Sequence, residues 1–123
     1  MNHLTRGIVL LCMVPLLFLQ GCGTATVQHP GAVNTFDSQA YDALLTTQAG
    51  IESAKTQFGA NPAAKAPLNA LIAAYDALQS TYKAYHTAAS AGTATAAQQA
   101  SVQSQIDAVK GQLSQVMTTF GGK

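Results

Sequence analysis

The chain has 123 residues, of which 48% are hydrophobic and only 9% are charged, and its formal net charge is +1. This length allows one small domain. The six basic and five acidic residues are scattered without runs, so we expect no nucleic-acid partner. The two cysteines, Cys12 and Cys22, are too few for a disulfide framework or a thiolate zinc site, and we expect no bound metal or cofactor.

The N-terminal residues have the pattern of a secretory signal peptide. Arg6 precedes an apolar run over residues 7–19, which contains Pro15 and ends without a cluster of charges. A membrane-spanning helix needs about 20 apolar residues, so this shorter run predicts export rather than anchoring.

The end of the run, Leu19-Gln20-Gly21-Cys22, resembles the lipobox of bacterial lipoproteins. An aliphatic residue lies three positions before the cysteine and a small residue lies immediately before it, although Gln20 departs from the small or aliphatic residue usual there. The resemblance implies cleavage between Gly21 and Cys22, which removes residues 1–21. It also implies a lipid on the Cys22 thiol, through which the membrane becomes a partner of the protein.

The same resemblance bears on the roles of the two cysteines and on the location of the protein in the cell. Cys12 follows the bulky Leu11 and does not fit the motif. The alternative for Cys22 is a free thiol after an ordinary signal peptide. In Gram-negative lipoproteins an aspartate after the lipidated cysteine often retains the protein at the inner membrane, so Gly23 implies the periplasmic face of the outer membrane.

A tether and a helical domain are expected to follow. Residues 22–36 lack an apolar period and contain a Pro30-Gly31 break, which predicts a flexible tether that includes His29. A helical bundle is expected over residues 37–120, and a flexible tail over 121–123.

The first helix is predicted over residues 38–58. Asp37 is in position to cap it, and Phe36 is expected to pack against Tyr41 as a hydrophobic staple. Gly59 is expected to end it. Its apolar stripe is broad and consists of Tyr41, Leu44, Leu45, Ile51 and Phe58.

The second and third helices are predicted over residues 64–90 and 96–120. Asn61-Pro62 favours a helix start, and Thr95 with Gln98 fits a capping box. Apolar residues recur at alternating spacings of three and four, as in heptads, so that they form one apolar seam that faces a partner helix. The seam residues are Leu68, Leu71, Tyr75, Leu78, Tyr82, Tyr85 and Ala89, then Val102, Ile106, Val109, Leu113, Val116 and Phe120.

These elements predict an all-α fold, an antiparallel up-down-up three-helix bundle. Short connections favour antiparallel neighbours, and a helix with one apolar seam is stabilised mainly by burying that seam. Alanine supplies little apolar area per residue, so a lone bundle of this size is expected to be only marginally stable. A homo-oligomer or another envelope protein would add to the buried area.

Motifs for catalysis are missing from the sequence. It has no glycine-rich phosphate loop, serine elbow or His-Glu-x-x-His zinc motif. The acidic residues are spread along the chain without an evident general acid and base pair; they are Asp37, Asp42, Glu52, Asp76 and Asp107. We expect no catalytic residue and no enzymatic activity.

A candidate partner or ligand surface consists of Tyr75, Tyr82, Tyr85 and His86. A small hydrophobic ligand between the second and third helices would require a cavity there. The alternative is that the tyrosines belong to the core and His86 is structural, since one histidine is a poor metal site. Buried hydroxyls would find partners in Gln48 or in glutamines and serines of the third helix.

The C-terminal residue suggests a second kind of attachment. Lys123 follows Gly121-Gly122 and, together with the lipid anchor and alanine-rich helices, resembles the murein lipoprotein of Gram-negative envelopes. In that family the terminal lysine is joined to peptidoglycan, although the helix is continuous there. The resemblance implies a cell-wall tether through Lys123; the alternative is a solvated chain end.

Together, the motifs predict a secreted, lipid-anchored envelope protein. Its role is expected to be that of a non-catalytic structural or protein-interaction module. The alternatives are the wall tether and the binder of a hydrophobic ligand.

Overall fold

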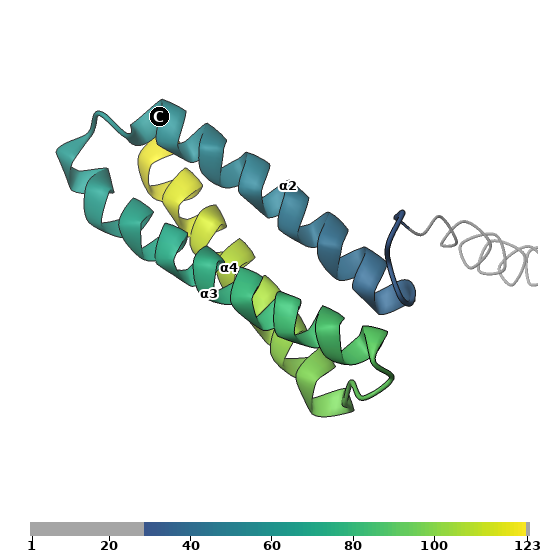
Figure 1. Cartoon of the computed structure of the whole chain (residues 1–123). Coiled ribbons are helices and arrows are strands. Elements are labelled where there is room, and N and C mark those ends of the chain that lie inside the picture. Colours follow the sequence, from purple (N-terminus) through teal and green to yellow (C-terminus); the bar gives the residue numbers. More distant parts are fainter. Residues whose placement is uncertain (1–28, 123) are drawn as a thin grey trace, which may run out of the picture.

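The computed structural model describes residues 29–122, so the expected signal peptide, Cys22 and Lys123 lie outside it. It contains the helices α2 (Thr35–Phe58), α3 (Lys65–Ser90) and α4 (Ala96–Gly121). A short 3₁₀ turn, η1 (Pro62–Ala64), precedes α3. The helices alternate in direction, with α2 and α4 running the same way and α3 against them (Figure 1). The predicted all-α three-helix bundle is confirmed.

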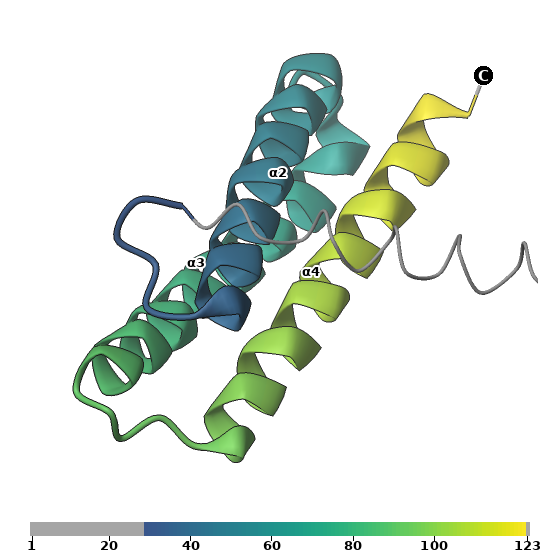
Figure 2. The ribbon, with the colours of Figure 1, turned by 90° about the vertical axis from the view of Figure 1, so that its right-hand side faces the viewer.

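The core is formed by the predicted seams. Helix α4 packs against both α2 and α3 (Figure 2). Within α2, however, only part of the predicted apolar stripe is covered, and Tyr41 and Leu45 are exposed to 41% and 45%. The buried seam residues are Leu44, Ile51, Phe58, Leu68, Leu71, Tyr75, Leu78, Tyr85, Val102, Ile106, Val109 and Val116.

The boundaries of the later elements follow the capping residues seen in the sequence. Gly59 ends α2, and the Asn61 side chain accepts the amide hydrogen of Ala63 at the start of η1. Thr95 and Gln98 form the expected capping box of α4. These residues satisfy amide hydrogens that have no partner within their own helix.

The start of α2 differs from the prediction. Helix α2 begins at Thr35, and Asn34 caps it by accepting the Asp37 amide hydrogen at 2.8 Å. The expectation that Asp37 is the cap is therefore wrong, because this residue lies within the first turn. The expected staple is wrong for the same reason: Phe36 packs edge-on against Tyr85, with ring centroids 5.2 Å apart.

The residues that lead into α2 are held against it. Gly31 adopts a positive φ of 89°, which permits a tight turn closed by a hydrogen bond from the Ala32 amide to the His29 carbonyl. The His29 amide donates to Ser38 Oγ and the Val33 amide donates to Asp37 Oδ2, each at 3.0 Å. Residues 29–32, part of the expected tether, thus form one wall of the hollow described next.

Candidate functional site

A mixed polar and aromatic hollow lies between the turn at residues 29–32 and the faces of α2 and α3. We call it the His29–His86 pocket. Its volume of about 490 Å³ falls in the range of small-molecule sites. Its lining residues are His29, Pro30, Gly31, Ala32, Tyr41, Tyr82, Lys83, His86 and Thr87.

A buried carboxylate lies behind the pocket. Asp37 is 0% exposed, and its Oδ2 accepts the Val33 amide hydrogen and lies 2.8 Å from His86 Nδ1. Its Oδ1 is buried without a hydrogen-bond partner among the described residues. A buried carboxylate requires compensation by hydrogen bonds or an opposite charge, and the Val33 amide and the His86 ring are the groups in position to supply it.

The orientation of His86 follows from this pair. Its side chain is 39% exposed, and Nδ1 is the nitrogen that faces Asp37. The second nitrogen, Nε2, is therefore the one that a ligand could engage. In the protonated ring Nε2 carries a hydrogen and can donate it.

Aromatic rings connect the two histidines across the pocket. His29 lies edge-on to Tyr41, with centroids 5.0 Å apart, and its Nε2 pairs with Asp42 on α2. Tyr41 lies 6.4 Å from Tyr82, which in turn lies 6.0 Å from His86. The turn at residues 29–32, helix α2 and helix α3 thus each contribute an aromatic side chain to the pocket.

The Tyr82 hydroxyl is held in its neutral form. Burial raises its pKa well above the ordinary value of 10, and the Asp37 carboxylate raises the pKa further, because a nearby negative charge disfavours a phenolate. Tyr82 therefore adds a neutral phenol to the wall, alongside the exposed ring of Tyr41.

The predicted candidate surface is divided by the fold. Tyr82 and His86 line the pocket, whereas Tyr75 and Tyr85 are buried in the core. The Tyr75 hydroxyl donates to the Leu44 carbonyl at 3.0 Å. Burial raises the pKa of Tyr75, and this shift is opposed in part by a hydrogen bond with its neighbour on α3, Gln79.

The hydroxyl of Tyr85 links all three helices. It accepts from Asn34 Nδ2 at 3.0 Å and from Gln99 Nε2 on α4 at 3.3 Å. A glutamine of the third helix was an expected partner and is confirmed. Gln48, the other expected partner, is exposed on α2, so this expectation is wrong.

Among the residues that line the pocket, His29, Tyr41 and Lys83 are not part of the predicted surface, and neither is the buried Asp37 behind them. The sequence places His29 in the tether, Tyr41 in the core stripe and Asp37 at a helix cap. The spacing of Asn34 and Asp37 is a signal that could have identified the role of Asp37, since a cap followed three residues later by an acidic side chain is typical of a helix start.

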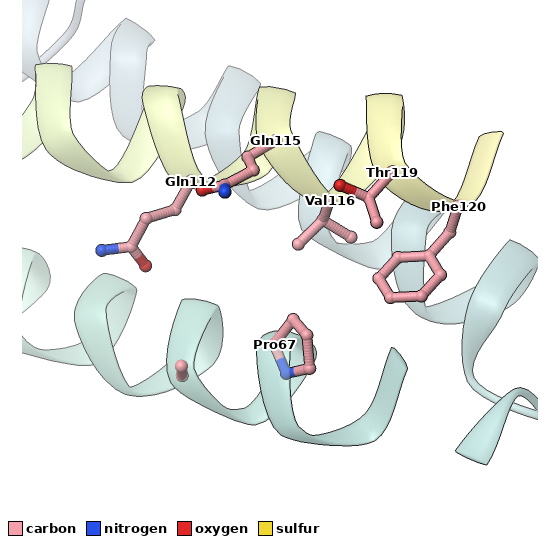
Figure 3. Close-up of a pocket in the computed structure, with 7 residues that line it drawn as sticks. Pro67, Gln112, Gln115, Val116, Thr119 and Phe120 are labelled. Atoms are coloured by element: carbon pink, nitrogen blue, oxygen red, sulfur yellow. The ribbon is translucent and has the colours of Figure 1, made fainter. Parts of the chain in front are cut away.

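A second hollow lies at the other end of the bundle, between α3 and α4 (Figure 3). Its volume is about 390 Å³. Val116 and Phe120 of α4 face Pro67 of α3 across it, while Gln112, Gln115 and Thr119 add polar groups (Figure 3). This groove lies between the two helices where a hydrophobic ligand would require a cavity, but none of the predicted tyrosines lines it.

Within residues 29–122 there is no group of three or more side chains able to hold a metal ion. None of the helices in this part of the chain is both long and apolar enough to cross a bilayer. Comparisons with known protein families, with curated proteins and with solved structures gave no match to the chain.

Proposed function

We propose that the protein is a lipid-anchored bacterial envelope protein that acts as a non-catalytic structural or interaction module. The observation that carries this proposal is the Leu19-Gln20-Gly21-Cys22 motif at the end of an apolar export signal. A diacylated or triacylated cysteine holds a protein at a bilayer without any membrane-spanning helix, because each buried methylene contributes about 0.8 kcal/mol.

The length of chain between Cys22 and the bundle supports this anchoring. Seven residue steps separate Cys22 from His29, and an extended chain covers at most about 25 Å over that length. A lipid on Cys22 would therefore keep the His29 end of the bundle close to the membrane surface. The His29–His86 pocket lies at this end.

An interaction role is supported by the surface of α2. Tyr41 and Leu45 lie one turn apart and are exposed, as is Val33 before the helix. The Tyr41 ring lies next to the Tyr82 ring, and this contact extends the surface from α2 onto α3. Exposed apolar side chains that lie close together are typical of surfaces that bind a partner, here a second copy or another envelope protein.

The test compares the two cysteines of the chain. In cells that export the protein, Cys22→Ser should leave the chain unprocessed or release it from the membrane fraction. Cys12→Ser is the matched control, since it removes a thiol of the same export signal, and this variant should remain processed and membrane-bound. Normal cleavage and unchanged membrane retention of Cys22→Ser would contradict the proposal.

A wall tether through Lys123 is a second candidate that the fold favours. Phe120, near the end of α4, packs against Phe58 at the end of α2, so α4 ends at the opposite end of the bundle from His29 (Figure 1). Helix α2 alone, with 24 residues, extends about 36 Å. A link between membrane and wall requires attachment points at opposite ends.

This candidate is tested on cell walls digested with lysozyme. Attachment predicts that the C-terminal peptide carries a muropeptide on Lys123, and that Lys123→Ala abolishes this product. Recovery of an unmodified C-terminal peptide alone would remove the candidate.

A further inference from the structure

The His29–His86 pocket contains charged groups that the anchoring function does not use. His29, Lys83 and His86 line it, with Asp42 paired to His29 and Asp37 paired to His86. Lys83 forms no salt bridge among the described residues.

The carboxylates of Asp37 and Asp42 differ in how strongly they would repel an anion bound in the pocket. Asp37 has no exposed surface and is covered by His86, whereas the side chain of Asp42 is 57% exposed and faces solvent beside His29. The charged groups that remain for a ligand are thus the Lys83 ammonium and the free Nε2 edge of His86.

These two donors share one face of α3. Lys83 and His86 lie three residues apart in a helix, which places their side chains side by side. The Lys83 ammonium and a hydrogen on His86 Nε2 match the two oxygens of a carboxylate, and hydrogen bonds to a charged group are stronger than neutral ones. Tyr41 and Tyr82 supply an apolar wall next to them.

We propose that this pocket binds a small organic carboxylate, with its charged group between Lys83 Nζ and His86 Nε2 and its apolar body against Tyr41 and Tyr82.

A calorimetric titration of the full chain in detergent tests this proposal with benzoate as the probe. We expect saturable binding of benzoate at pH 7, and no comparable binding of the neutral analogue benzamide. N-acetylphenylalanine and its amide show whether the carboxylate can come from a peptide C-terminus. If N-acetylphenylalanine binds and its amide does not, a peptide C-terminus also fits the pocket. If benzoate binds and N-acetylphenylalanine does not, the pocket accepts only small organic acids.

Two lysine variants separate the pocket from general charge effects. Lys83→Gln removes an exposed ammonium, leaves the core intact, and should weaken benzoate binding by about tenfold. Lys110→Gln removes an exposed lysine of α4 outside the pocket and should leave the affinity unchanged. His86→Gln should also weaken binding of benzoate, with circular dichroism as the check on folding.

The proposal is overturned if neither benzoate nor N-acetylphenylalanine binds at millimolar concentration. It is also overturned if benzamide binds as well as benzoate, or if the two lysine variants behave alike. These titrations do not depend on the lipid, so their failure leaves the Cys22 experiment unaffected.

Discussion

Removal of either member of the Asp37–His86 pair should have unequal effects on stability. Asp37 is completely buried, whereas the His86 side chain is 39% exposed. His86→Ala therefore leaves the Asp37 carboxylate without its imidazole partner, in a site that water reaches only through the gap left by the ring. Asp37→Ala leaves an imidazole that water can solvate.

The structure sets the size of each effect. Breaking a buried ion pair by removing one partner costs about 3–5 kcal/mol when the other charge stays buried. For His86→Ala we expect a somewhat smaller loss of about 2–3 kcal/mol, because the Val33 amide still donates to Asp37. Asp37→Ala loses that hydrogen bond and a favourable charge in the first turn of α2, which together amount to about 1–2 kcal/mol.

The assay is urea unfolding of the full chain at pH 7, followed by circular dichroism. His29→Ala is the matched control, because its partner Asp42 is exposed, and surface pairs are worth about 0–1 kcal/mol. The double variant, Asp37→Ala with His86→Ala, should be more stable than His86→Ala alone, since it removes the stranded carboxylate.

The reasoning would be refuted by a double variant less stable than His86→Ala. It would also be refuted if Asp37→Ala proved the more damaging single change. Either result would mean that the buried carboxylate does not depend on His86 for its compensation.

Three further outcomes follow from local features. Because the pKa of Tyr82 is raised on folding, the folded protein keeps the phenolic proton at a pH where the unfolded chain has lost it. The free energy of unfolding should therefore fall as the pH rises above about 10, and it should fall less in Tyr82→Phe. An equal pH dependence in the two proteins would contradict this. Gly111→Ala in open space on α4 should stabilise the fold by about 0.5–1 kcal/mol. Gly50→Ala should stabilise the fold less than Gly111→Ala, or destabilise it, because the added Cβ would lie 2.5 Å from Leu113 Cδ2. A higher melting temperature for Gly50→Ala than for Gly111→Ala would contradict this. Thr95→Ala removes the capping box of α4 and should cost about 1 kcal/mol by urea unfolding, whereas an unchanged midpoint would rule out this role.

Much of the fold could be predicted because its signals are local. The alternating seam of α3 and the capping box at Thr95 depend on residues within a few positions of each other. The same holds for Gly59 and Asn61, which separate α2 from α3. Periodicity and capping therefore predict the helices and their order without knowledge of tertiary contacts.

The pocket could not be predicted because its contacts are distant in sequence. Asp37 pairs with a histidine 49 positions later, and Asn34 bonds a tyrosine 51 positions later. Both Asn34 and Asp37 are good capping residues, and local sequence alone does not choose between them. The choice depends on His86 of α3, which engages the Asp37 carboxylate.

The central claim is that a lipid on Cys22 holds the protein in the envelope. Intact-mass and peptide mass spectrometry of the protein purified from membranes tests it most directly. The account predicts a mature chain that begins at Cys22 and carries acyl mass on that residue. A mature chain that begins elsewhere, or an unmodified cysteine at its start, would contradict it.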